Sequence, residues 1–92
     1  MRTKKTYSTT IGIYDAETMI LLSEYGEHFT THSALSAIRH AIRSAKKFIA
    51  TDRRFALMAE HGLTALQLES LVKSGEIDLL KNRVFKAISC TP

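Results

Sequence analysis

Alternating apolar positions near the start of the chain predict a β-hairpin. Residues 6–14 are rich in β-branched and aromatic side chains. Every second residue from Tyr7 to Ile13 falls on one face, as in a half-buried strand. Asp15 then occupies the first position of a predicted type I turn, where its carboxylate can accept hydrogen bonds from the backbone. Residues 19–25 are expected to return as the second strand.

Gly26 leaves the number of strands open. It permits a turn or a bulge, after which residues 27–31 are compatible with a short third strand. We therefore expect a β unit over residues 6–31 with two or three strands. Because a two-stranded hairpin alone is marginally stable in water, this unit needs a helix to pack against.

The apolar spacing changes to a helical period after Ser33, which is a favourable N-cap. Aliphatic residues then recur at spacings of three and four, so the sequence predicts an amphipathic helix over residues 33–50. Its aliphatic stripe is expected to face the β unit, and its opposite, basic side to face solvent. The stripe comprises Leu35, Ile38, Ile42, Ala45 and Ile49.

Short helices are predicted over residues 53–88. The first is expected to begin after Thr51 or Asp52, and Gly62 and Gly75 stand where left-handed residues commonly end helices. A last helix is expected after Asp78, at residues 79–88. The predicted fold class is therefore α+β: a small antiparallel β-hairpin of two or three strands followed by about four helices, in one domain over residues 1–92.

The composition excludes several classes of protein. With 92 residues the chain is too short for several domains, and its one cysteine cannot form an internal disulfide. No apolar run approaches the roughly 20 residues of a membrane span, and a polar, Thr-rich segment follows the basic N-terminus where a signal peptide would be apolar. We expect a cytoplasmic protein that does not associate with membranes.

The charge is concentrated in one block. The net charge is +4, from 13 Lys and Arg against 9 Asp and Glu, but residues 39–54 hold six cations and one acid. Such a cluster can neutralise several phosphates and bind nucleic acid with little dependence on sequence. An acidic protein surface is the alternative partner, and a solvated helix face is the simplest structural explanation. The six cations are Arg39, Arg43, Lys46, Lys47, Arg53 and Arg54.

Residues 54–73 resemble the DNA-binding helix-turn-helix motif. They contain a glycine at a turn position, and Thr64 with Gln67 forms a predicted capping box for the second helix. The side chains offered for base recognition would be Gln67, Ser70 and Lys73. Glu69 departs from the motif, because its carboxylate would repel a phosphate backbone. An ordinary αα-hairpin is the alternative.

No catalytic or metal-binding pattern stands out. His28 and His32 have a spacing that places both on one side of a strand, but a metal site needs three or four ligands. The chain lacks a phosphate-binding glycine loop and a nucleophile motif. We expect no cofactor, no metal and no enzymatic activity.

Two functions agree with these observations. The first is a small, non-enzymatic, regulator-like protein that acts on nucleic acid or a nucleic-acid-containing complex through its basic helix face. The alternative is a phage-type inhibitor or adaptor, such as an anti-defence protein, that docks on a partner protein or nucleoprotein complex and blocks it. Tyr7, Tyr14 and Tyr25 would then contribute to the protein interface, because tyrosine is favoured at binding hot spots.

Overall fold

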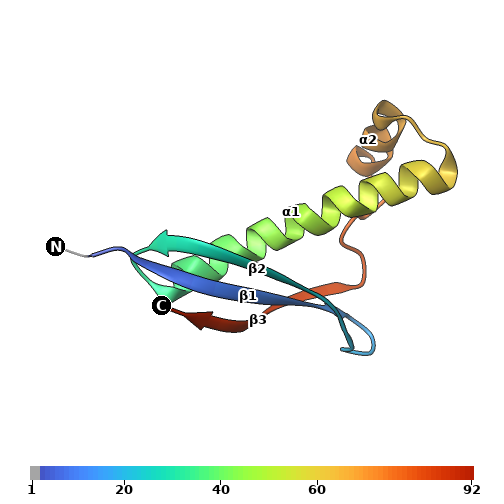
Figure 1. Cartoon of the computed structure of the whole chain (residues 1–92). Helices are drawn as coiled ribbons and strands as arrows, with labels where there is room; N and C mark the ends of the chain where they lie inside the picture. The colour runs from blue at the N-terminus through green and yellow to red at the C-terminus, as the bar shows by residue number, and fades with distance from the viewer. Residues whose placement is uncertain (1–2) are drawn as a thin grey trace. The chain divides into compact units, whose positions relative to one another are not determined.

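A computed structural model describes residues 3–92 (Figure 1), so Met1 and Arg2 of the basic N-terminus lie outside the described part. A three-stranded antiparallel sheet has the strand order β2-β1-β3. The elements in chain order are β1 (Lys5–Asp15), β2 (Leu21–Thr31), α1 (Ala34–His61), α2 (Ala65–Lys73) and β3 (Arg83–Thr91).

The chain divides into two compact units, which we describe separately. The sheet unit comprises Met1–Lys46 and Asn82–Pro92, and the helical unit comprises Lys47–Lys81. Helix α1 contributes its residues up to Lys46 to the sheet unit and its later residues to the helical unit.

The fold is α+β, but the expectation of a hairpin followed by about four helices is wrong: residues 3–92 form two helices and a third strand from the C-terminal segment. The helix expected at residues 79–88 is instead a turn followed by β3. Its apolar spacing is compatible with a helix, but Val84, Phe85 and Ile88 are also typical strand residues. Pairing with β1 decides between the two, because this segment is the second neighbour of the central strand.

The helix break expected at Thr51 or Asp52 is also wrong. Helix α1 runs without interruption from Ala34 to His61. No glycine or proline occurs within it, and a residue that can cap a helix does not stop one whose backbone hydrogen bonds continue.

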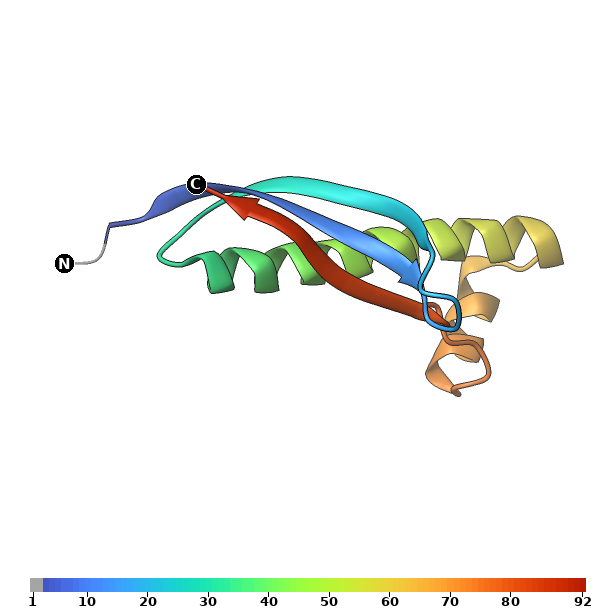
Figure 2. The ribbon, with the colours of Figure 1, turned by 90° about the horizontal axis from the view of Figure 1, so that it is seen from below.

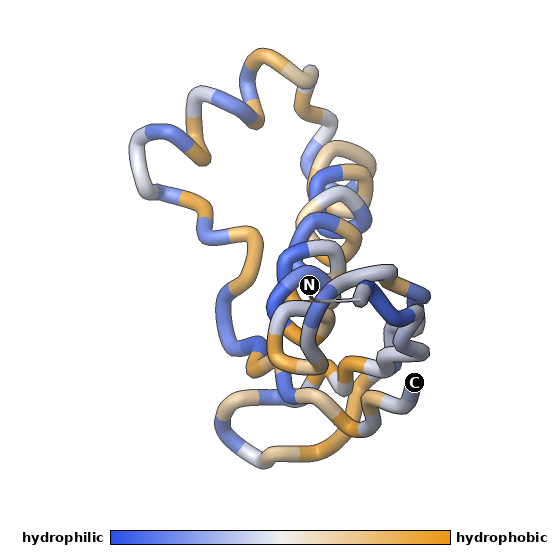
Figure 3. Tube along the Cα trace, turned by 90° about the vertical axis from the view of Figure 1, so that its left-hand side faces the viewer, coloured by the Kyte–Doolittle hydropathy of each residue, from blue (hydrophilic) through white to orange (hydrophobic). Residues whose placement is uncertain are grey.

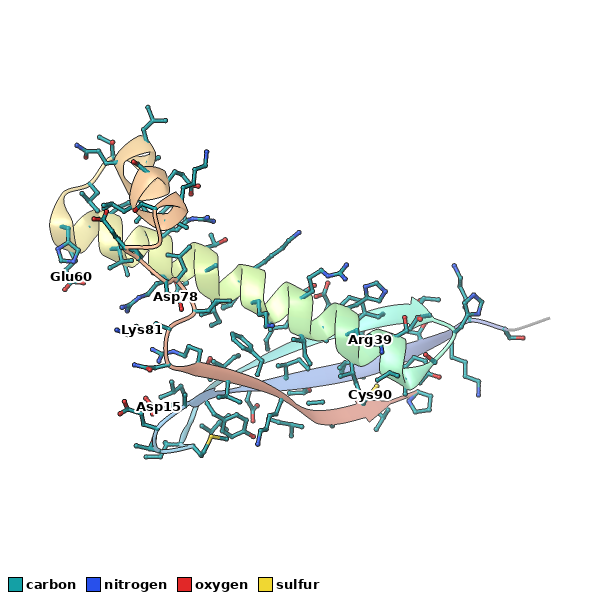
Figure 4. The ribbon with its side chains drawn as sticks, turned by 180° about the vertical axis from the view of Figure 1, so that it is seen from behind. Asp15, Arg39, Glu60, Asp78, Lys81 and Cys90 are labelled. Carbon is teal, nitrogen blue, oxygen red and sulfur yellow. The ribbon has the colours of Figure 1, made fainter. Side chains whose placement is uncertain are left out.

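The hairpin prediction is confirmed for β1 and β2. Asp15 Oδ1 accepts hydrogen bonds from the backbone N–H of Glu17 and Thr18 at 2.9 and 3.0 Å. These bonds, chiefly that from Thr18, lower the pKa of the Asp15 carboxyl below its ordinary value of 3.8. The turn is also joined to the start of β3, since the N–H of Ala16 donates to the carbonyl of Asn82 at 2.9 Å (Figure 4).

The short third strand considered for residues 27–31 does not exist as a separate element. Strand β2 continues through Gly26 to Thr31 and pairs with β1 over that length. Gly26 makes no turn there, because the ladder has no irregularity at the Thr10–Gly26 pair.

The core of the sheet unit lies between β1 and α1 (Figure 2). The predicted inward face of β1 is confirmed, because Ile11 and Ile13 are buried. On the helix side the buried residues are Ala37, Ala41 and Ala45, whereas Leu35 of the predicted stripe is 57% exposed. Small side chains at four-residue spacing let the helix backbone approach the sheet closely, so the alanines form the contact.

The helical unit is held by the end of α1, by α2 and by the turns between residues 61 and 81. Gly62 and Gly75 have φ of +63° and +83°, which confirms them as left-handed residues after each helix. The capping box of Thr64 and Gln67 is present at the start of α2. Leu68 is almost fully buried, and Figure 3 shows polar and apolar residues alternating along the turns of the helices.

Candidate nucleic-acid interface

Three cations of the sheet unit lie on the solvent side of α1. Arg39 and Arg43 each follow a buried alanine by two residues, about 200° around the helix, and therefore point away from the sheet. Lys46 is three residues further along and is also exposed. Together with Ile42, these three side chains line a shallow depression of about 340 Å³.

Within the part of the chain that the structure describes, no ion pair neutralises the charges around this depression. Helix α1 has no acidic residue before Asp52. Among residues 3–92 the structure forms one ion pair, between Arg54 and Glu69. Like charges four residues apart on a helix repel each other by about 0.2–0.5 kcal/mol. The repulsion between Arg39 and Arg43 therefore lowers the stability of the helix slightly.

Strand β3 supports one of the three cations. The Lys46 ammonium lies 5.9 Å from the centre of the Phe85 ring, at the outer limit of a cation–π contact. The contact orients the Lys46 side chain toward β3, while the residue stays exposed. Neither Phe85 nor Ile42 was identified from the sequence as a neighbour of these cations. Phe85 was assigned to a helix, and Ile42 was assigned to a buried stripe.

The structure divides the six predicted cations between the two units. Lys47, Arg53 and Arg54 belong to the helical unit, where Lys47 and Arg53 are exposed. Arg54 Nε lies 3.0 Å from Glu69 Oε1, although the geometry falls short of a hydrogen bond. Both side chains are more than one third exposed, so solvent screens the pair and it contributes at most about 1 kcal/mol. Arg54 is thereby partly neutralised before any ligand arrives.

The predicted recognition helix, α2, offers little free contact chemistry. Gln67 Oε1 accepts a hydrogen bond from the N–H of Thr64 at 2.9 Å, so its side chain serves as a cap. Bidentate reading of adenine needs both the oxygen and the nitrogen of such an amide. Ser70 and Lys73 are exposed, and they are the remaining candidates for contacts on α2.

The three tyrosines differ in their surroundings. Tyr7 is buried in the core of the sheet unit. Tyr25 is half-buried, and its hydroxyl donates a hydrogen bond of 2.6 Å to Glu27 Oε2, which raises the pKa of the Tyr25 phenol. Tyr14 is half-buried, and its ring lies against Gly12, where an added Cβ would be 2.7 Å from Tyr14 Cε2.

An apolar surface that the sequence analysis did not single out lies at the hairpin. The run from Met19 to Leu22 was assigned to the turn and second strand, yet its four side chains are between 42% and 62% exposed. Ile88 on β3 is also 46% exposed. The signal in the sequence was the uninterrupted apolar run itself, which is unusual beside a solvent-exposed turn.

Residues 3–92 contain no group of three or more His, Cys, Asp and Glu side chains that could hold a metal ion. His28 and His32 are exposed. Cys90 lies in β3 (Figure 4) and is half-buried, with its Sγ 3.5 Å from Thr9 Oγ1 and 3.8 Å from the Ala34 carbonyl oxygen. None of the helices described is long and apolar enough to cross a membrane.

Comparisons with known proteins produced no match: no protein-family model fits the chain, and no curated protein and no solved structure is significantly similar to it.

Proposed function

We propose that this protein is a non-enzymatic nucleic-acid-binding protein that contacts the phosphate backbone through Arg39, Arg43 and Lys46. The observation that carries the proposal is the depression on α1, lined by three exposed cations without an acidic partner. Phosphate oxygens would replace the missing counter-charge and relieve the repulsion between the cations.

The proposed contact is to the backbone and not to the bases. The cations stand on one exposed helix side, and the nearest apolar neighbour in the depression is Ile42, which offers no hydrogen bond to a base edge. His40, the aromatic residue beside Arg39 on α1, is stacked on Phe29, and Phe48 lies in the helical unit, so base stacking at this site is not part of the proposal. Binding of this kind depends on salt and varies little with sequence.

The test compares the wild-type protein with a variant in which Arg39, Arg43 and Lys46 are all replaced by glutamine. Binding to a fluorescent random-sequence DNA duplex and to a single-stranded RNA is measured by anisotropy at low salt. The variant should bind both at least tenfold more weakly, while circular dichroism and thermal unfolding remain unchanged because all three side chains are exposed.

Two results would contradict the proposal. One is equal binding by the variant and the wild type. The other is that the wild type binds neither nucleic acid but does bind a polyglutamate peptide, which would assign the cations to an acidic protein surface.

A second candidate function is docking on a partner protein, as an adaptor or inhibitor. It is favoured by the exposed run from Met19 to Leu22, because an apolar segment at a hairpin tip is typical of protein interfaces. Replacing Ile20 and Leu22 by serine should abolish capture of such a partner and leave nucleic-acid binding unchanged. The glutamine variant of the three cations should show the opposite behaviour if the two surfaces act separately.

A further inference from the structure

The outer edge of β2 is available for pairing with another strand. In the order β2-β1-β3 the central strand is paired on both sides, and within residues 3–92 no strand pairs with β2 on its other side. The backbone N–H and C=O groups along that edge therefore face away from the sheet. An exposed edge of this kind is a template for another strand.

The two edges of the sheet are not equivalent. Strand β3 carries an irregularity where Ile11 pairs with Ala87 and Thr10 with Ser89, so that Ile88 is an extra residue. It also presents Lys86, and bulges and lysines are features that discourage edge pairing. Strand β2 has its irregularity near its start, between the pairs of Ile13 and Tyr14. From Ser23 to Thr31 it is regular and contains neither proline nor lysine.

The charged side chains of β2 favour pairing with a second copy centred on Gly26 over pairing centred on Glu24 or Glu27. When two copies of one strand pair antiparallel about a two-fold axis, the residue numbers of every opposed pair add up to the same value. The residue at the axis therefore lies opposite the same residue of the other copy. Centring on Glu24 or Glu27 would place like charges opposite each other, which is destabilising. Centring on Gly26 places Glu24 opposite His28 on the open face of the sheet.

The inward face agrees with the Gly26 register. There Glu27 of one copy lies opposite Tyr25 of the other, and the Tyr25 hydroxyl already donates to Glu27 within one copy. Gly26 is exposed, so the backbone at the two-fold axis is accessible to a partner strand.

The helices leave room for this arrangement. Helix α1 packs over β1 through Ala41 and Ile11 and over β2 through His40, which stacks on Phe29. In the paired sheet the two β1 strands are about 14 Å apart, and points midway between β1 and β2 in the two copies are about 10 Å apart. Since packed helices lie about 8–10 Å apart, the two α1 segments of the sheet units fit side by side on the same face.

We propose that two copies of this chain form a dimer by antiparallel pairing of β2 with β2 about Gly26, giving a continuous six-stranded sheet. The inference does not depend on the proposed nucleic-acid binding, and it is tested without nucleic acid.

A single cysteine tests the register. In a Cys90→Ala background, Gly26→Cys should form an intermolecular disulfide on mild oxidation, because directly opposed residues in antiparallel strands have Cα atoms about 4.5–5.5 Å apart. The substitution is tolerated by the fold, since an added Cβ meets only Thr10 Oγ1 and the Thr9 carbonyl, both at 3.9 Å. His28→Cys is the matched control, because the two copies of residue 28 would be about 13 Å apart.

A charge exchange tests the pairing in solution by analytical ultracentrifugation. Glu24→Lys alone and His28→Glu alone should each weaken the dimer about tenfold, since the pair occurs twice per dimer. The double variant should restore it. The restoration cannot arise within one copy, because Glu24 and His28 are about 13 Å apart along the strand.

A wild-type chain that sediments as a monomer up to about 100 µM, far above the Kd of a specific dimer, would overturn the proposal. So would a disulfide that forms through His28→Cys and not through Gly26→Cys, or a double variant no better than the single ones. Nucleic-acid binding by a monomer would leave the proposed function intact and reject the dimer, so the two can fail separately.

Discussion

The salt dependence of nucleic-acid binding should report how many phosphates the α1 cations contact. Arg39, Arg43 and Lys46 line the depression in the sheet unit, so three contacts are expected. With about 0.9 counterions released per contact on duplex DNA, the slope of log K against log salt should be about −2.7. Affinity should then fall about 40-fold between about 50 mM and about 200 mM salt.

Removing two of the contacts gives a quantitative check. For Arg39→Gln with Arg43→Gln, the slope should shrink to about −0.9, and the loss over the same salt range to about 3.5-fold. The measurement is fluorescence anisotropy of a labelled duplex over a series of salt concentrations.

The matched control is Arg54→Gln, which removes one charge from the helical unit. Because Arg54 already faces Glu69 at 3.0 Å, its loss should change the slope far less than the loss of Arg39 or Arg43 alone. If Arg54→Gln reduces the slope as much as Arg39→Gln does, binding follows net charge and the argument from the depression is refuted.

Three further predictions concern the fold. Ala41→Leu should lower the free energy of unfolding by about 1–3 kcal/mol in urea denaturation, since Ala41 is fully buried against Ile11. Leu35→Ala, at an exposed position, should change the free energy of unfolding by less than about 0.5 kcal/mol. Gly75→Ala should lower the free energy of unfolding by about 1 kcal/mol in thermal unfolding, because φ at this position is +83°. Gly26→Ala should be tolerated, because φ there is not positive and the added Cβ makes only ordinary contacts. The carboxyl of Asp15 has a lowered pKa in the folded state, so its contribution to stability is present above the ordinary pKa of 3.8 and is lost as the pH falls through the folded-state pKa. The difference in urea stability between the wild type and Asp15→Ala should therefore close in that acidic range. A difference that persists at the lowest pH would contradict the assignment.

Local signals in the sequence predicted the elements whose formation depends on neighbouring residues. Ser33 Oγ accepts the N–H of Ser36 at 3.1 Å, as expected of an N-cap. The turn at Asp15, the capping box before α2 and the left-handed glycines after both helices were likewise predicted correctly. In each case the stabilising bond or backbone angle involves residues a few positions apart, so the sequence alone contains the information.

The candidate site was predicted only in part. The concentration of cations in residues 39–54 pointed to the stretch of chain that contains the depression, because charge spacing on a helix follows directly from the sequence. It did not show that Arg54 faces Glu69, nor that Phe85 lies under Lys46. Both contacts join residues distant in sequence, so they depend on how α1 meets α2 and β3.

By itself, the sequence determined the β1–β2 hairpin, the start of α1, the ends of both helices and the location of the basic block. Tertiary structure decided whether Val84 to Ile88 became strand or helix, because the period was compatible with both and the unfilled edge of β1 selected the strand. It also decided which side of α1 is buried. Ala45 of the predicted stripe is buried and Ile42 packs against the core, but the most buried line on α1 runs through Ala37, Ala41 and Ala45. Their small side chains let the helix lie close to the sheet.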